Sequence, residues 1–135
     1  MTFIHGKGQV FLFATHDLSA YLNNVAYKRS ADSHDVTTFG ATGHAFQGGL
    51  TNGTYTLTGT YDNGASNTPK TLIEAALGGA LQAVDYREAG TATGRTTSTA
   101  NALVTAYEES GPVADMISWT ATLQISGAVT VGVQP

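Results

Sequence analysis

The alternation of residue types between Thr54 and Tyr61 constrains the fold of this 135-residue chain more than any other feature. Threonine occupies every second position, and the positions between hold tyrosine, leucine or glycine. Successive residues of a β-strand face opposite sides of a sheet, so this stretch predicts a strand with one hydroxyl face and one largely apolar face. Such a hydroxyl face favours contact with water in a pore or with a neighbouring subunit. The threonines of this face are Thr54, Thr56, Thr58 and Thr60.

A second long strand with the same division is predicted between Met116 and Ser126. Its odd-numbered positions from Ile117 to Ile125 are apolar, whereas its even-numbered positions are small and polar. Two strands of this kind suggest one curved sheet whose polar side they share. Neither stretch contains a charged residue. The polar residues expected on the second strand's part of that side include Ser118, Thr120 and Thr122.

The composition favours a subunit of a larger structure. Charged residues make up 12% of the chain, against roughly a quarter in an ordinary soluble domain. Charge is depleted where protein surface is covered by protein. The net charge of -4 argues against nucleic-acid binding, which needs clustered lysine and arginine. With no cysteine, neither a disulfide framework nor a thiolate zinc site is possible.

No targeting or membrane segment is expected. The short apolar run from Phe11 to Phe13 lacks the length and the cleavage site of a secretion signal. No stretch approaches the roughly 20 apolar residues of a membrane span. We therefore expect a single domain over residues 1–135 that is cytosolic where it is made and does not bind membranes.

One short helix is predicted over residues 69–77. Thr68 is a good N-cap, Pro69 suits the first helical position, and Gly78 suits the C-terminal cap. A helix this short survives only by docking an apolar stripe on a sheet. The residues expected to dock it are Leu72, Ile73 and Leu77.

Two glycine-containing segments are expected to be irregular. Residues 40–49 contain four glycines, which predicts a long mobile loop between strands, and Asn52-Gly53 is a tight-turn signal. Beyond Gly127, the tail over residues 127–135 either extends the preceding strand after a bulge or forms an arm that pairs with a neighbour. The residues singled out in this loop are Gly40, His44, Phe46 and Gly49.

No constellation in the sequence supports an enzyme. The four histidines show no metal-binding spacing, and no serine lies in a nucleophile elbow. The segment from Gly90 to Thr96 departs from a phosphate loop in its glycine spacing, and Arg95 replaces the lysine. Glu108 and Glu109 are adjacent on a predicted strand, so they face opposite sides. We therefore expect no catalytic, cofactor or metal site.

The order of these features resembles the major tail proteins, or tail tube proteins, of long-tailed bacteriophages, in the compact form seen in phages of actinobacteria. The resemblance lies in the opening FIHGKG, the segments DLSAYLNNV and RSADSHDVTTFG, the strand GGLTNGTYTLTGTYD, the helix, and the closing DMISWTATLQISGAV. It implies a mainly β fold: a β-sandwich or partial barrel of two packed antiparallel sheets with one flanking helix.

The resemblance also implies a function. Such subunits form stacked rings of six, with a continuous β-lined pore through which DNA passes as cargo without specific binding. The loop over residues 40–49 would reach the adjacent ring. The expected partners are copies of the chain and other phage structural proteins in the tail of a virion.

Two alternatives remain open. The first is a capsid decoration or head-tail completion protein of related fold, which would form small oligomers rather than stacked rings. The second is a carbohydrate-binding β-sandwich module, which would present exposed aromatic side chains on a platform. The alternation of tyrosine with threonine fits burial better than such a platform.

Overall fold

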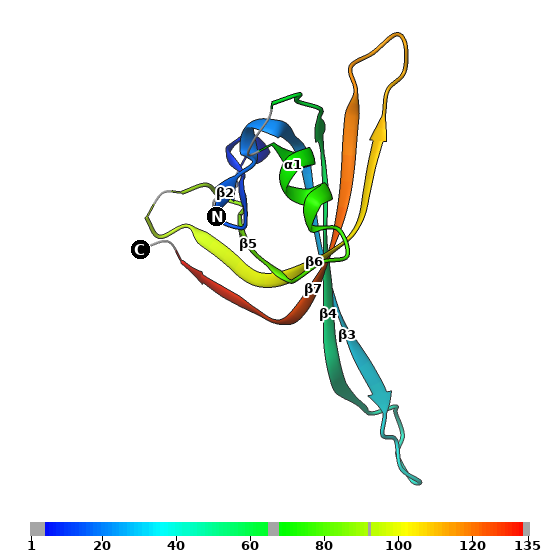
Figure 1. Cartoon of the computed structure of the whole chain (residues 1–135). Coiled ribbons are helices and arrows are strands. Elements are labelled where there is room, and N and C mark those ends of the chain that lie inside the picture. The colour runs from blue at the N-terminus through cyan, green and yellow to red at the C-terminus, as the bar shows by residue number, and fades with distance from the viewer. Residues whose placement is uncertain (1–4, 65–67, 92, 134–135) are drawn as a thin grey trace.

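The computed structural model describes residues 5–64, 68–91 and 93–133. Its strands form one seven-stranded sheet in the order β2-β1-β5-β6-β7-β4-β3, and every pair of neighbours is antiparallel (Figure 1). The mainly β class and the single short helix are confirmed. The two packed sheets expected from the resemblance are instead one continuous sheet, which curls around the core without closing into a barrel.

Four of the seven strands are long and three are short. The strands are β1 (Val10–Phe13), β2 (His16–Asp17), β3 (Leu22–Asp35), β4 (Phe46–Thr60), β5 (Gln82–Arg87), β6 (Thr96–Ser110) and β7 (Ser118–Val133). Single 3-10 turns occupy Gly6–Gly8 and Ser19–Tyr21.

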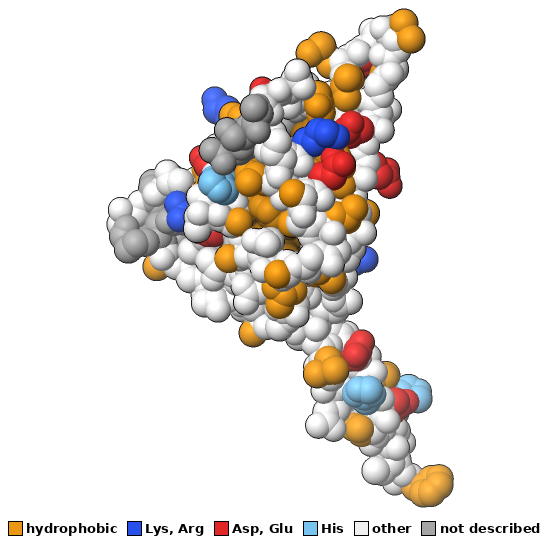
Figure 2. Space-filling model, in the orientation of Figure 1, with side chains coloured by type: hydrophobic (Ala, Val, Ile, Leu, Met, Phe, Trp, Pro, Cys, Tyr) orange, Lys and Arg blue, Asp and Glu red, His pale blue; other side chains and the backbone are white. Residues whose placement is uncertain are grey.

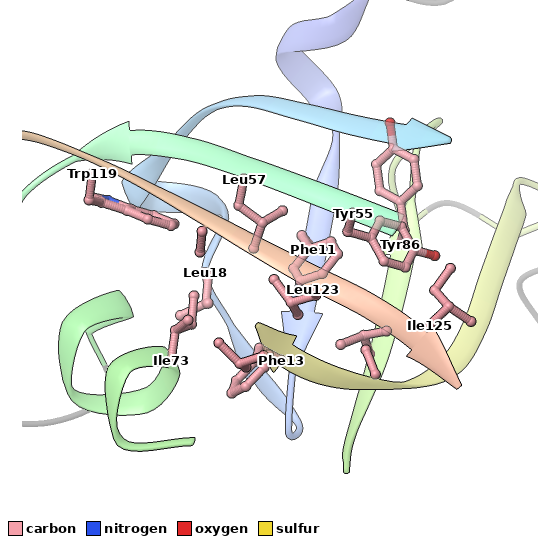
Figure 3. Packing of buried hydrophobic residues seen from close by; sticks show 14 residues of the cluster. Phe11, Phe13, Leu18, Tyr55, Leu57, Ile73, Tyr86, Trp119, Leu123 and Ile125 are labelled. Carbon is pink, nitrogen blue, oxygen red and sulfur yellow. The ribbon is translucent and has the colours of Figure 1, made fainter. Parts of the chain in front are cut away.

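The core lies against the apolar faces of β4 and β7, where the sequence predicted it (Figure 3). Trp119 is fully buried, and its indole Nε1 donates a hydrogen bond to the carbonyl oxygen of Thr60 at 3.2 Å. Tyr55 is also buried and stacks on Tyr27 of β3 with 4.9 Å between ring centroids. Burial of each large apolar side chain contributes about 1.5–3 kcal/mol. The core therefore holds β3, β4 and β7 together.

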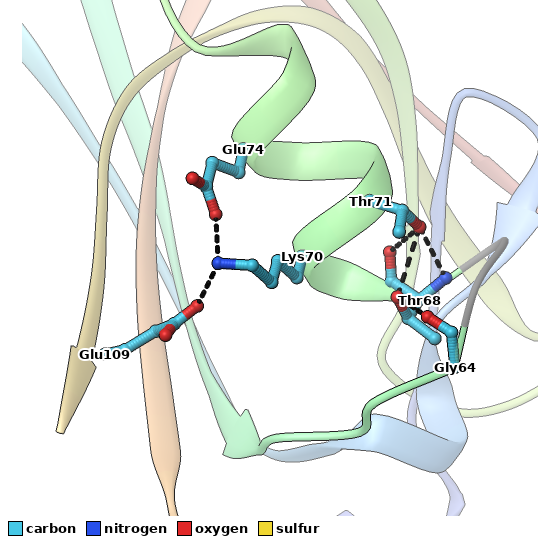
Figure 4. Close-up of polar contacts among 6 residues, drawn as sticks. All are labelled: Gly64, Thr68, Lys70, Thr71, Glu74 and Glu109. Carbon is cyan, nitrogen blue, oxygen red and sulfur yellow. Dashed lines mark hydrogen bonds and ion pairs between the residues drawn. The ribbon is translucent and has the colours of Figure 1, made fainter. Parts of the chain in front are cut away.

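Helix α1 (Pro69–Ile73) begins as predicted but ends early. Thr68 and Thr71 form a capping box, in which the Thr71 hydroxyl accepts a hydrogen bond from the Thr68 amide at 3.0 Å (Figure 4). Ile73 is fully buried and Leu72 packs partly against the core, but Leu77 is 46% exposed. The prediction that Leu77 docks the helix is therefore wrong.

The reason for the error at Leu77 lies in the helix geometry. After Ile73 the chain tightens into a 3-10 turn, Glu74–Ala76. A 3-10 helix has three residues per turn, whereas an α-helix has 3.6. The side chains that follow Ile73 are therefore rotated away from the apolar stripe expected for a continuous α-helix. Leu77 itself is extended and forms a parallel bridge with Val104 of β6.

Lys70 ties the helix to the sheet. Its Nζ lies 2.8 Å from Glu74 Oε2 and 2.9 Å from Glu109 Oε1 on β6 (Figure 4). The hydrogen bond from Lys70 is the main cause that lowers the pKa of Glu109 below its ordinary value of 4.5. One ammonium group at the surface thus links the helix to β6, in addition to the buried side chain of Ile73.

Residues 40–49 do not form the single long loop that their glycines predicted. β4 begins at Phe46, and β3 and β4 project from the body as a two-stranded ribbon beyond Lys28 and Gly53, which we call the arm (residues 29–52; Figure 1). The Asn52-Gly53 turn signal lies inside β4. A register shift between Ala31 and Ser33 places one additional residue in β4.

The tail also takes a defined course. β7 continues past Gly127, which has φ +84°, and its residues 130–133 pair with Thr96 to Thr99 of β6. Strand extension, one of the two alternatives, therefore describes residues 127–133, whereas residues 134–135 lie outside the described part.

Candidate functional site

The four long strands share one face that points away from the core, and we call it the polar face. Side chains of paired residues lie on the same side of a sheet, so the strand register groups this face into rows across β3, β4, β7 and β6. The rows are Lys28, Thr54, Gln124 and Leu103; Ala26, Thr56, Thr122 and Ala106; Asn24, Thr58, Thr120 and Glu108; and, across three strands, Thr60, Ser118 and Ser110.

The predicted threonine faces of the two strands coincide. Thr56 pairs with Thr122, and Thr58 pairs with Thr120. Their side chains are half-buried, whereas the residues between them are fully buried on the core side. The structure therefore brings together the residues singled out on both strands, and their part in lining a pore or facing a subunit stays a prediction.

Two charged residues on this face were missed by sequence reasoning. Lys28 lies in β3 and Glu108 in β6, and all other positions of the four rows are uncharged. The face as a whole is neutral, although it is not free of charge. Lys28 lies on this face because its strand partner is Thr54, and such a pairing between strands distant in sequence cannot be read from local alternation.

Both outer edges of the four-stranded array are open. β3 pairs only with β4, and β6 pairs only with β7 from Thr105 to Ser110, within the residues that the structure describes. An edge strand presents unpaired N–H and C=O groups, which readily pair with a strand of another chain. Each edge is thus ready to accept a further strand.

The arm carries the loop residues that the sequence singled out. Gly40 and His44 lie in the connection between β3 and β4, and Phe46 and Gly49 lie in β4. A Cβ at Gly49 would lie 2.8 Å from His34 Nε2 and 3.0 Å from Asp32 Cβ, so a larger residue there would displace these side chains.

The polar contacts near the tip of the arm are local. His44 Nδ1 lies 3.5 Å from Asp35 Oδ2, and both side chains are exposed. Hydrogen bonds from the Thr37 side chain and backbone are the main causes that lower the pKa of Asp35. These contacts shape the end of β3 near the surface of the arm.

Hydrophobic side chains are exposed at both extremities of the molecule (Figure 2). Phe39 at the tip of the arm is fully exposed and Phe46 is 64% exposed, while Val113 and Met116 are exposed at the turn between β6 and β7. Exposed apolar patches of this kind mark protein interaction sites. The two ends of the molecule are therefore candidate contact regions.

The arrangement offers little for other kinds of site. Among residues 5–64, 68–91 and 93–133, no group of three or more acidic or histidine side chains is placed to hold a metal ion. None of the helices described is long and apolar enough to cross a membrane. Tyr55 and Tyr86 are buried in the core, so they form no aromatic platform for a sugar.

No family model and no curated protein matches the sequence. Solved structures do match. A chain of the tail of an empty gene transfer agent particle with C6 symmetry superposes with a TM-score of 0.75 and 14% identity, covering 95% of this chain and 98% of that one. A chain of the SPP1 tail tube superposes with a TM-score of 0.76 and 14% identity, covering 97% of this chain and 80% of that one. A chain of the sheath-tube complex of the contractile injection system PVC superposes with a TM-score of 0.74 and 15% identity, covering 96% of this chain and 91% of that one.

These identities establish a shared fold. The resemblance to tail tube proteins that the sequence order suggested is confirmed at that level, and the compact actinobacteriophage form stays a prediction. The chain has the fold of proteins found in phage tails, gene transfer agent tails and contractile injection systems.

Proposed function

We propose that this chain is the structural subunit of a tail tube, which assembles with copies of itself into stacked rings and forms a conduit for DNA. The observation that carries the proposal is a neutral polar face on four long strands with an open edge at each side, in a fold shared with tail tube chains. We propose six copies per ring, because the tail of the gene transfer agent particle, which contains a chain of similar fold, has C6 symmetry.

The open edges support closure into a ring. A contact between the β3 edge of one copy and the β6 edge of the next is head-to-tail, and such contacts either close into a ring or continue as a filament. Closure leaves no free edge in the array. The polar face then lines the inside, and the core and α1 lie outside it.

The polar face suits a passage for DNA. Affinity for the phosphate backbone comes from lysine and arginine that neutralise phosphates. On this face the single positive charge of Lys28 is offset by Glu108, and the remaining side chains are uncharged. A duplex would therefore slide along hydroxyl groups that hold water and do not bind phosphate strongly.

The arm supports stacking. Its β3 part, residues 29–35, spans about 23 Å at about 3.3 Å per residue. A two-stranded ribbon is marginally stable alone in water, and this one exposes Phe39, Phe46 and Leu50. We place the arm on the adjacent ring, where these side chains would become covered.

Electron microscopy of the concentrated, purified protein tests the tube. Open-ended tubes are expected. Discrete trimers or monomers would contradict the proposal and favour a capsid decoration protein. A second sample, in which a two-residue Asn-Gly hairpin turn replaces residues 36–45, should fold normally and form no tubes.

The assignment of the polar face to the pore needs its own test. With Thr56→Lys and Thr120→Lys together, tubes should still assemble, because lysine extends into water. DNA passage should slow, and the defect should lessen as salt rises. The matched control carries asparagine at both positions and should behave like the parent. If the lysine variant forms no tubes at low or high salt, the face packs on a neighbouring subunit.

A further inference from the structure

We propose that Lys28 of one copy pairs with Glu108 of the next copy, and that this pair sets the register in which the β3 edge joins the β6 edge. The inference rests on the proposed tube and specifies its subunit contact. The partner is a second copy of the same chain.

Charge complementarity is the first argument. The four rows of the polar face contain two charged residues of opposite sign, and these lie on the two outer strands, one at each open edge. Both side chains are exposed. Within the described residues, Lys28 and Glu108 make no ion pair with each other or with any other side chain. A head-to-tail contact brings these two edges together, and complementary charges across an interface fix its register.

Strand direction is the second argument. The array has four strands, all antiparallel to their neighbours, so β3 and β6 run in opposite directions. The β3 edge of one copy therefore meets the β6 edge of the next in antiparallel orientation. If Lys28 lies opposite Glu108, Ala26 lies opposite Ser110 and Ala31 opposite Thr105. The junction then uses the whole open edge of β6.

The stagger of this register is the third argument. The row through Lys28 reaches Gln124 on β7, whereas the row of Glu108 crosses β7 at Thr120, four residues away. The register thus advances by one residue per strand around the ring. An eight-stranded barrel with a shear of eight residues also advances by one residue per strand, and its strands tilt by about 36° from the barrel axis. Closed barrels have tilts of about 35–45°, so the proposed junction is compatible with closure.

Paired cysteines give the most direct test, because the chain has none of its own. Opposed residues of antiparallel strands have Cα atoms about 4.5–5.5 Å apart, within the range that a disulfide spans. The variant with Lys28→Cys and Glu108→Cys, assembled and then oxidised, should give a ladder of covalent oligomers that ends at the ring size. Each single-cysteine variant should give no ladder. Dimers from Lys28→Cys alone would overturn the proposal, because they would show β3 paired with β3.

Charge exchange tests the ion pair itself. Lys28→Glu or Glu108→Lys alone should raise the protein concentration needed for assembly by about tenfold or more, because like charges then meet at every junction. The double exchange should restore assembly to within about threefold of the parent. Arg95→Glu, an equal charge change on the exposed loop before β6, is the matched control and should have little effect.

The outcomes separate this inference from the proposed function. Tubes from the parent protein, with no rescue in the double exchange and no ladder from the paired cysteines, would reject the Lys28–Glu108 junction and leave the tube intact. Failure of the parent to form tubes or rings would reject the proposed function instead. Circular dichroism of every variant before assembly checks that each subunit is folded.

Discussion

The two halves of the β3–β4 hairpin have the same backbone pairing but opposite environments. In β4, every second residue from Gly53 to Gly59 is buried, whereas every residue from Phe46 to Asn52 is exposed. The difference is the third strand, because β7 pairs with β4 only from Thr54 to Thr60. One half belongs to a packed sheet and the other is a ribbon without a core. The buried apolar contacts of this hairpin thus lie in the body, and the arm contributes none of the buried side chains of β4.

The root of the arm is held by a few specific contacts. The Gln124 side chain donates a hydrogen bond to the Gly53 carbonyl oxygen at 2.9 Å and another to the Asn52 side chain. Gly53 is buried, and a Cβ there would lie 2.9 Å from Ile125 Cδ1 and 3.2 Å from the Lys28 carbonyl oxygen. These contacts determine where the arm leaves the body.

Two leucines of β4 give the largest contrast. Leu57 is fully buried and Leu50 is 82% exposed. We expect Leu57→Ala to lower the free energy of unfolding by about 2–5 kcal/mol, since a buried leucine is lost with a cavity left behind. Leu50→Ala should change it by about 0.5 kcal/mol or less but should weaken tube assembly. Urea denaturation measures the first effect and electron microscopy the second. Equal losses of stability would contradict the division between body and arm.

Alanine substitutions at two glycines of the same strand should differ in their effect on stability by less than the two leucine substitutions do. Gly53→Ala should cost about 1–3 kcal/mol because the new methyl group is overpacked against a backbone carbonyl. Gly48→Ala meets no atom within 4 Å, so it should be close to neutral. Thermal unfolding compares the two variants directly. A neutral Gly53→Ala would show that the root of the arm is looser than its contacts indicate.

Removal of the Gln124 side chain should have a smaller effect. Gln124→Ala loses the hydrogen bonds to the root of the arm, which we expect to cost about 0.5–1.5 kcal/mol. Amides of residues 46–53 should exchange faster with solvent, whereas those of 54–60 should not change. Thr122→Ala, in the next row of the same strand, is the control. Faster exchange in both halves of β4 would argue against a role for Gln124 at the root.

The smallest effect concerns the pH dependence of stability. The pKa of Glu109 is lowered in the folded state, first by the hydrogen bond from Lys70. Its contribution to stability is therefore complete above the ordinary value of 4.5 and is lost as the pH falls through the lower folded value. Melting temperatures between about pH 6 and about pH 3 should fall less for Glu109→Gln than for the parent.

The sequence predicted the two faces of β4 and β7 because alternation is a local signal. It did not predict that Lys28 and Glu108 share those rows, because strand pairing is a long-range property. Asn52-Gly53 is a turn signal in isolation, but pairing with β3 on one side and proximity to Ile125 on the other make it a strand position. Leu77 was misplaced because the change from α to 3-10 geometry has no signature in the apolar stripe. The four glycines in residues 40–49 favoured a loop over the whole segment, so the sequence did not predict that β4 begins at Phe46.

The additional residue in β4 near the middle of the arm acts as a phase shift in the alternation of its side chains. Between Ala31 and Ser33, β3 advances by two residues while β4 advances by three, from Thr51 to Gly48. If β4 alternated regularly through all of its residues, Phe46 would face the same side as the even-numbered threonines. With the additional residue, Phe46 pairs with Asp35 and faces the side of Tyr55. The bulge therefore keeps the aromatic ring of Phe46 off the threonine side of the hairpin.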